Sequence, residues 1–393
     1  ELDYQQSLNA MVTNTSLISN LIFPVVMLVG LFLAFDGRLT MGTVSTAASM
    51  ANFVITPCHQ IAQCWAKVKS SQGIRQRLEA AMAEPQVAEQ GEPIGHIDSI
   101  QCETVRFAYP NTAEPVLKDA SLTVDAAQKV ALVGESGCGK STLAKLLFQY
   151  YPDYSGDILF NGRQVRTLDR TALYRRVGYI AQTAYLFHDT IRNNICLHED
   201  FPDEQLAHAI AAAGLTDWVA SLPDGLDTVI SENGKNLSGG QRQRIGIARA
   251  LIVEPEFIIA DEPISALDMS IRAQVLNLLR HLQKERGITY LFIAHDLSVM
   301  RYISDRIAVI HKGDIVELAD AEELVNHAIH PYTRSLLSAI PMPNPRLERK
   351  KKLLVYDPAM HDYTADPPQW QELRPNHFVL CNATEAAQWI REL

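Results

Sequence analysis

Charged residues are almost missing from the beginning of the sequence. No residue from Tyr4 to Phe35 carries a charge, and Ser16 to Phe35 is a mostly apolar run of 20 residues, the length that spans a bilayer core. A secretory signal peptide would have basic residues before such a run, whereas Glu1 and Asp3 precede this one. The sequence therefore predicts a transmembrane helix. The alternative is a helix buried in a domain away from the membrane.

A second stretch without charge runs from Leu39 to Ala66 and leads into a basic cluster. The cluster consists of Lys67, Lys69, Arg75 and Arg77. Positive charge beside a membrane helix favours the cytoplasmic side of the membrane. The pattern predicts a second membrane helix, with everything after it on the cytoplasmic face of the inner or plasma membrane. The alternative is again a buried helix.

Paired cysteines, internal repeats and low-complexity tracts are also missing. The six cysteines include no C-x-x-C pair, which argues against a zinc site or a disulfide framework and fits a reducing compartment. A net charge of −10 argues against nucleic acid as the main partner. We interpret the one local basic run, Arg346 to Lys352, as a solvated helix face.

Short apolar runs alternate with helical segments after a linker that ends near Asp98. Four of these runs end in a polar or glycine turn: QKVALVG, RRVGYIAQ, EFIIADE and TYLFIAHD. Buried strands separated by helices predict an α/β fold with a mainly parallel sheet, in which ligands bind at the carboxyl ends of the strands. Beyond about Ala319 the chain becomes a proline-rich, polar extension that ends in the amphipathic segment ATEAAQWIREL.

The stretch GESGCGKST matches the phosphate-binding pattern G-x-x-x-x-G-K-[ST], between a strand-like and a helix-like run. Glycines let the backbone curl around phosphates, and the helix N-terminus adds partial positive charge. We expect Lys140 to reach the β- and γ-phosphates and Ser141 to bind Mg²⁺. The loop residues expected to hold nucleotide are Gly134, Ser136, Gly137, Cys138, Gly139, Lys140, Ser141 and Thr142. The alternative for the whole motif is a glycine turn that contains a lysine by chance. For Cys138 we expect a small residue tolerated between glycines, and the alternative is a redox role.

Two acidic residues and a histidine follow later strand-like runs. Asp261 is expected to hold Mg²⁺, usually through water, and Glu262 to polarise an attacking water in phosphoryl transfer. His295 closes the run TYLFIAHD, from which its imidazole could reach the γ-phosphate. Taken alone, a histidine at a strand end is more often a capping residue.

These motifs together resemble the nucleotide-binding domain of ATP-binding cassette (ABC) transporters, over roughly Asp98 to Ala319. The most specific match is LSGGQ, Leu237 to Gln241, which is similar to the family's signature. Other residues match the adenine-stacking aromatic, the Q-loop glutamine, the D-loop and the switch histidine: Tyr109, Gln182, Ser265 to Asp268, and His295. The resemblance implies ATP and Mg²⁺ as cofactors. It also implies a P-loop NTPase fold and catalytic roles for Glu262, His295, Lys140 and Gln182, the last also near the metal.

The resemblance also implies a head-to-tail pair of cassettes, as a homodimer or a heterodimer. Ser238, Gly239, Gly240 and Gln241 of the signature, and Asp268 of the D-loop, would then serve the nucleotide of the partner cassette. The alternative for Ser238 is an ordinary helix N-cap. One departure from the family is Ala127, where glycine is usual, and it predicts a strained turn that costs on the order of 1 kcal/mol.

The two halves of the sequence resemble different subfamilies. The part up to about residue 240 is similar to fused membrane and ATPase half-exporters, with residues 1–90 matching their last two membrane helices. The part from about 245 is similar to the ATPase subunits of oligopeptide importers, with residues 321–393 as their C-terminal extension. A lone Cys381 cannot build the cysteine-ligated cluster that some importers carry there. Our hypothesis is a chimera joined within residues 237–246, around a cassette at 98–320.

The leading interpretation is a transport ATPase that couples ATP hydrolysis to movement of a peptide, lipid or drug-like solute. Its expected partners are a second cassette, the membrane and transmembrane permease helices. The two expected membrane helices cannot build a substrate path, which predicts either a fragment or pairing with other chains. The alternatives are an oligopeptide importer ATPase with a foreign N-terminus, a soluble ABC-type ATPase clamp, and a fragment without catalysis.

Overall fold

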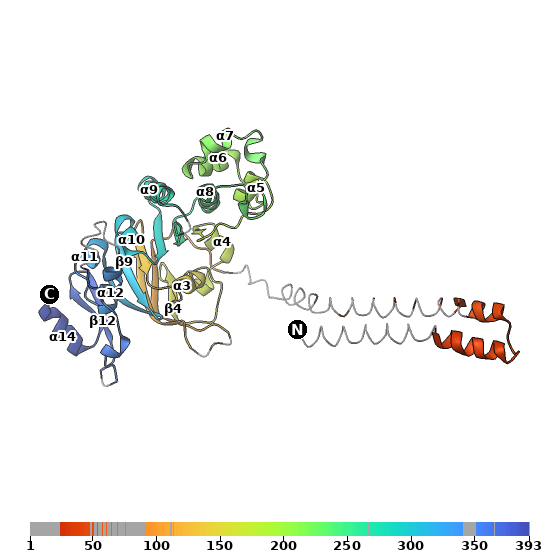
Figure 1. Ribbon diagram of the computed structural model, residues 1–393. Helices are drawn as coiled ribbons and strands as arrows, with labels where there is room; N and C mark the ends of the chain where they lie inside the picture. Colours follow the sequence, from red (N-terminus) through yellow and green to blue (C-terminus); the bar gives the residue numbers. More distant parts are fainter. Residues whose placement is uncertain are drawn as a thin grey trace. The chain divides into compact units, whose positions relative to one another are not determined.

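The computed structural model describes residues 24–47, 49–50, 91–110, 112, 114–265, 267–340, 351–364 and 366–392, with single positions between 53 and 75. The chain divides into two compact units, Glu1–Ala88 and Glu89–Leu393 (Figure 1). Residues 16–23 of the first predicted membrane helix, most of the second one and residues 346–350 of the basic run lie outside the described residues.

The described part of the first unit is a helical hairpin. Residues 24–35 and 41–47 are helical, and the side chains of Thr40 and Thr43 bind each other's backbone amides at the start of the second helix. A Cβ on Gly30 would lie 2.7 Å from Val44, so the absence of a side chain at Gly30 lets the two helices approach. Within the described residues, no helix combines the length and the apolar character needed to cross a bilayer.

The second unit is built on one large, mixed sheet. The strand order along its main path is β5-β4-β1-β2-β10-β9-β3-β8-β7-β6, and β12 and β11 continue from β10. The strands are β1 Ser99–Phe107, β2 Leu117–Asp125, β3 Lys129–Val133, β4 Ser155–Phe160, β5 Arg163–Gln164, β6 Val177–Ile180, β7 Phe257–Asp261, β8 Thr289–Ala294, β9 Arg306–His311, β10 Asp314–Asp320, β11 Gln369–Arg374 and β12 His377–Cys381.

The four strands expected from the sequence are neighbours in the parallel part of this sheet. β3, β8, β7 and β6 pair in parallel in that order, and β9 adds to β3 on the other side. Strands β7 and β8 are buried at every position, as their uninterrupted apolar sequences require. The prediction is confirmed for these strands. The antiparallel part was not predicted: β1 pairs with β2 and β4, and β10 with β9 and β12.

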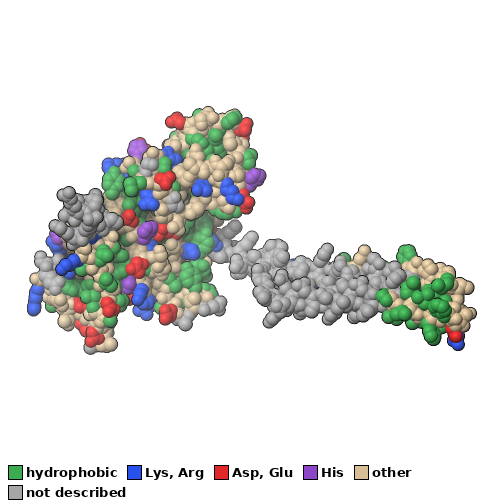
Figure 2. Space-filling model, in the orientation of Figure 1, with side chains coloured by type: hydrophobic (Ala, Val, Ile, Leu, Met, Phe, Trp, Pro, Cys, Tyr) green, Lys and Arg blue, Asp and Glu red, His purple; other side chains and the backbone are tan. Residues whose placement is uncertain are grey.

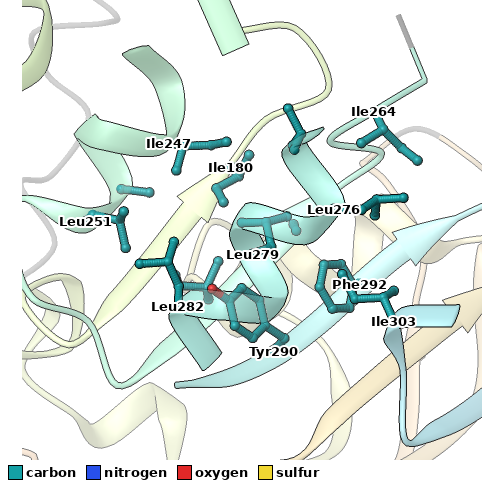
Figure 3. Close-up of a cluster of buried hydrophobic side chains, with 14 of the residues drawn as sticks. Ile180, Ile247, Leu251, Ile264, Leu276, Leu279, Leu282, Tyr290, Phe292 and Ile303 are labelled. Carbon is teal, nitrogen blue, oxygen red and sulfur yellow. The ribbon is translucent and has the colours of Figure 1, made fainter. Parts of the chain in front are cut away.

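Some of the helices cover the sheet, and others gather beside it (Figure 1). They are α3 Lys140–Leu147, α4 Arg170–Tyr174, α5 Ile191–Cys196, α6 Asp203–Ala212, α7 Thr216–Ala220, α8 Gly239–Leu251, α9 Met269–Arg286, α10 Leu297–Ile303, α11 Ala321–Asn326, α12 Pro331–Ala339 and α14 Ala383–Glu392. Both α5 and α6 pack on α8. Figure 3 shows the core beneath α9, where Leu279 and Leu282 face Tyr290 and Phe292 of β8.

The C-terminal segment joins the same compact unit. β12 pairs with β10 through Glu317 and Leu318, and it forms a hairpin with β11. The final helix, α14, buries Trp389 against this region, as its amphipathic sequence predicts. Because β12 adds directly to β10, the extension is continuous with the sheet that carries the site.

Candidate nucleotide-binding site

The loop from Gly134 to Thr142 turns sharply between β3 and α3. Gly137 and Gly139 have φ angles of +83° and +110°, in the region that favours glycine. A Cβ on Gly139 would lie 2.7 Å from a Leu117 methyl group, and one on Gly134 would lie 2.2 Å from the Ile310 carbonyl oxygen. The glycines are therefore required by both conformation and space. The curled backbone and the start of α3 together fit the phosphates of a nucleotide.

Lys140 is buried within this loop. Its ammonium group donates hydrogen bonds to the carbonyl oxygens of Gly134, at 2.5 Å, and of Glu135, at 2.8 Å. It also lies 3.6 Å from the Cys138 sulfur. Burial raises the pKa of the Cys138 thiol, and the positive charge of Lys140 opposes that rise. Cys138 thus fills space beside Gly134, while the loop backbone orients Lys140; Ser136 lies exposed on the loop.

Oxygen ligands for a metal ion come together at the carboxyl end of β7. The Ser141 hydroxyl donates to a carboxylate oxygen of Asp261 at 3.3 Å, and the Tyr179 hydroxyl donates to the other oxygen at 3.1 Å. Hydroxyl and carboxylate oxygens are the hard ligands that Mg²⁺ prefers, so this pair fits the ion. Tyr179 was not predicted. Burial and the neighbouring Asp261 carboxylate raise its pKa, which keeps the hydroxyl protonated as a donor.

Glu262 lies one residue beyond Asp261 and meets two other predicted residues. The Gln182 side-chain amide donates to its carboxylate at 2.9 Å, and His295 Nδ1 lies 3.3 Å from the other oxygen. The same Gln182 nitrogen donates to Ser265 at 3.2 Å. Glu262 has a φ of +46°, an unusual conformation for a residue with a side chain. Such strain is often concentrated at functional sites.

In the described part of the chain, the Gln182 side chain does not bind the two residues proposed to hold the metal ion. Within the described residues, no hydrogen bond joins it to Ser141 or Asp261, since its amide nitrogen points to Glu262 and Ser265.

Tyr109 lies at the edge of the phosphate loop. Its hydroxyl is 2.9 Å from the Thr142 hydroxyl, and its ring packs edge-to-face against Phe107 and Tyr151. Phe107 is buried, whereas Tyr109 and Tyr151 are half-buried and present an aromatic surface beside the start of α3. This position fits contact with a base whose phosphates lie on the loop.

The signature residues begin α8. The Ser238 hydroxyl accepts from the Gln241 amide at 3.2 Å, while the Gln241 side chain accepts from the Ser238 amide at 2.9 Å, a capping box. Ser238 is therefore a helix N-cap, as the alternative interpretation held, and its role toward a partner's nucleotide stays a prediction. A Cβ on Gly239 would lie 3.5 Å from Leu267 of the D-loop, and one on Gly240 would lie 3.0 Å from Ile271 of α9.

The signature does not join the rest of the site within this chain. Among the residues that the structure describes, no hydrogen bond or ion pair connects residues 238–241 to Gly134–Thr142. Asp268 is exposed at the start of α9, while Arg272 holds the D-loop by donating to the Ser265 and Leu267 carbonyl oxygens.

Tyr332, in the C-terminal segment, also reaches the phosphate loop. Its hydroxyl accepts a hydrogen bond from the Glu135 backbone amide at 3.2 Å. The sequence HPYT around it belongs to the importer-like extension, but nothing in its local pattern indicates a contact with the loop.

Comparisons with known proteins agree with this geometry. Residues 117–265 match the family model described as ABC transporter, and residues 316–364 match the one described as oligopeptide/dipeptide transporter, C-terminal region. The oligopeptide transport ATP-binding protein OppF of Streptococcus pyogenes serotype M1 is 46% identical over 293 residues, covering 70% of this chain and 92% of its own. OppF of Bacillus subtilis is 43% identical over 289 residues, covering 71% and 94%.

A solved structure is also similar. It is a bacterial Atm1-family ABC exporter with ATP bound, which aligns with a TM-score of 0.58 and 29% sequence identity. The alignment covers 83% of this chain and 57% of the exporter chain. The chain thus spans little more than half of that exporter's length.

Proposed function

The chain belongs to the family of ABC transporter ATP-binding proteins that includes the oligopeptide transport protein OppF, and from this premise we propose that it energises transport of oligopeptides. Proteins of this family hydrolyse ATP coupled to transport. The observation that carries the proposal is the grouping of Lys140, Asp261 and Glu262 at the carboxyl ends of β3 and β7, next to the C-terminal region typical of oligopeptide and dipeptide transporters.

The chemical roles follow from the geometry of the site. Gly134–Thr142 would hold the phosphates, with Lys140 neutralising their charge, and Tyr109 would lie against the base. Ser141 and Asp261 would hold Mg²⁺, which stabilises charge on the transferred phosphoryl group. Glu262 would act as general base toward the attacking water.

His295 and Gln182 would support the general base. Both contact the Glu262 carboxylate, at 3.3 Å and 2.9 Å, and so orient it from two sides. We propose a positioning role for these two side chains in hydrolysis.

A second cassette would complete the site. The signature Ser238–Gln241 presents a helix N-terminus that, in the described part of the chain, has no hydrogen bond or ion pair to the phosphate loop, and such an N-terminus binds anions well. In a head-to-tail pair, each signature and Asp268 would face the nucleotide of the other cassette.

Exposed apolar side chains before and after α5, and at Val229 opposite Thr190, are suited to the permease. The side chains of Tyr185, Phe187, Leu197 and Val229 are all about half exposed. Tyr185 and Phe187 pack edge-to-face with ring centroids 5.2 Å apart, three to five residues after Gln182. Clustered exposed apolar residues mark interaction sites. We propose that permease helices bind here, which would place the cassette on the cytoplasmic face of the membrane.

Residues 1–90 would be an exporter-like membrane segment attached to this cassette. The exporter alignment covers 83% of the chain, whereas Glu89–Leu393 makes up less than 80% of it, so the alignment includes part of the first unit. Exposed apolar side chains on the described hairpin, among them Phe32 and Phe35, also suit a lipid or helix environment; Figure 2 shows hydrophobic atoms gathered there.

The proposed seam at 237–246 joins two cassette sequences that are themselves related. The OppF alignments cover about 70% of the chain, which is more than residues 245–393 contain, so they cross the seam. We retain the domain division 1–90, 98–320 and 321–393 as a proposal, and the junction of two subfamilies within 237–246 stays a hypothesis.

ATP hydrolysis by the purified chain tests the enzymatic part of the proposal. Glu262→Gln removes the general base, and we expect kcat to fall by roughly 100-fold or more while the affinity for ATP changes little. Glu204→Gln, on the exposed face of α6, is the matched control and should keep full activity. A wild-type rate no higher than that of Glu262→Gln would remove the ATPase function and favour a fragment without catalysis.

A further inference from the structure

Backbone groups of the phosphate loop also form hydrogen bonds to segments outside it. At its first residues, the Glu135 amide donates to the Tyr332 hydroxyl at 3.2 Å. Near its middle, the Cys138 carbonyl oxygen accepts from the Gly313 amide at 3.0 Å. Gly313 lies in the turn between β9 and β10, so a cassette element makes the second contact. The C-terminal segment makes the first, across 197 residues of sequence.

Glu135 links this contact to the lysine. The amide of Glu135 is bound by Tyr332, while the carbonyl oxygen of Glu135 accepts from the Lys140 ammonium group at 2.8 Å. Fixing this one residue therefore fixes an acceptor for Lys140. The Tyr332 ring packs against His311, with centroids 4.1 Å apart, and His311 directly follows the Ile310 carbonyl that closes over Gly134.

Tyr332 is itself rigidly placed. It is the second residue of α12 and only 2% exposed. The His330 ring nitrogen Nδ1 accepts from the Tyr332 amide at 3.1 Å and caps the helix. The Tyr356 ring packs against the Tyr332 ring, with centroids 5.4 Å apart. The Tyr332 hydroxyl is therefore held in one position, in which it accepts a hydrogen bond from the Glu135 amide.

A buried carboxylate ties this helix start to the C-terminal hairpin. Glu317 of β10 is fully buried, and its two oxygens accept from the amides of Ile329, at 2.7 Å, and His330, at 3.3 Å. His377 of β12, also fully buried, binds the same carboxylate at 2.7 Å. The chain of contacts thus runs from β12 through Glu317 and the start of α12 to Tyr332.

We propose that Tyr332 is a positioning residue for the phosphate loop, through which the C-terminal segment sets the affinity of the cassette for nucleotide. This inference rests on the proposed ATP-binding function and adds a residue to its site. The loop is preorganised before nucleotide binds, which lowers the ordering cost of binding. Because the contact involves the loop and no reacting atom, it affects the affinity for ATP and ADP alike and leaves the hydrolysis step nearly unchanged.

The test compares Tyr332→Phe with Tyr356→Phe in the full chain. Both remove one hydroxyl from the same aromatic cluster, but only the Tyr332 hydroxyl has a hydrogen bond among the described residues. Dissociation constants for Mg-ATP and Mg-ADP are measured by calorimetry, well below the melting temperature of each variant. We expect Tyr332→Phe to weaken both by about twofold to tenfold, the range of a single neutral hydrogen bond, with kcat at saturating ATP within about twofold of wild type.

Hydrogen exchange gives a second readout that a loss of general stability would not produce. Coupling between two sites is reciprocal, so ATP should slow amide exchange in residues 329–340 of the wild type and of Tyr356→Phe, and less so in Tyr332→Phe. Equal ATP and ADP affinities in Tyr332→Phe and wild type, or equal protection of residues 329–340, would overturn the proposal. If the wild type itself bound no ATP, the proposed function would fail instead.

Discussion

Ala127 has a backbone conformation that is strained for a residue with a side chain. Its φ is +58°, in the left-handed region, as the departure from the family pattern predicts. The conformation is held because the Ala127 amide donates to Thr289 at 2.8 Å and its carbonyl oxygen accepts from Gln283 at 2.9 Å. Both bonds connect the turn before β3 to α9 and β8, so the backbone cannot relax without losing them.

Ala127→Gly should therefore stabilise the protein. Removing the methyl group relieves roughly 1 kcal/mol of strain, from which the greater freedom of glycine in the unfolded chain subtracts a part. We expect the free energy of unfolding in urea to rise by about 0.5 kcal/mol. Ala126→Gly is the matched control, since Ala126 has no positive φ, and it should destabilise. A loss of stability in Ala127→Gly as large as in Ala126→Gly would contradict the account.

At the scale of elements, the start of α12 carries a buried histidine that must stay neutral. Burial, together with charge repulsion from nearby His361, His311 and Arg334, lowers the pKa of His330 to about 3. In the unfolded chain a histidine titrates near 6.5. Between these two values the unfolded chain binds a proton that the folded chain refuses. The contribution of His330 to stability is thus complete above pH 6.5 and is lost as the pH falls from 6.5 toward 3.

Acid should therefore weaken the fold through this residue. Between pH 7 and pH 5 we expect His330 to lower the free energy of unfolding by roughly 2 kcal/mol. His330→Asn removes the titrating group but keeps an N-cap acceptor for the Tyr332 amide. Urea unfolding at the two pH values should give a smaller difference for His330→Asn than for the wild type. The same pH dependence in both proteins would show that His330 does not contribute.

At the scale of the whole molecule, two compact units share one chain. Glu89–Leu393 contains the complete sheet, the phosphate loop, Asp261, Glu262 and the C-terminal segment. The relatives OppF of S. pyogenes and B. subtilis match about 70% of this chain while covering more than 90% of their own. The matching part of this chain thus corresponds to nearly the whole length of these oligopeptide transport ATP-binding proteins.

Deleting residues 1–88 separates the roles of the two units. We expect the shortened chain to keep its affinity for ATP and to copurify with oligopeptide permease subunits. It should also be released from membranes by a carbonate wash that leaves the full chain attached. The full chain carrying Tyr356→Phe, prepared in the same way, is the control for losses during purification and washing. Loss of permease binding on deletion would instead support an exporter in which the first unit is the transport partner.

Residues close together in the sequence were predicted well, because their chemistry depends on local geometry. Gly137 and Gly139 are required by the curl of the phosphate loop itself. The uninterrupted apolar run of β7 is typical of a buried strand, which ends at Asp261, just before Glu262. The N-cap at Ser238 likewise follows from a pattern of four residues.

Contacts between distant segments were decided only by the tertiary structure. Tyr179 meets Asp261 because β6 and β7 lie side by side, and Tyr332 meets Glu135 because α12 packs over the end of β9. The pairing of β12 with β10 belongs to the same class. The sequence by itself determined the loop, the strands and the acidic residues, since steric and burial preferences act over a few residues. Which hydroxyl reaches which amide depends on how those elements pack, and no local pattern encodes a contact across 197 residues.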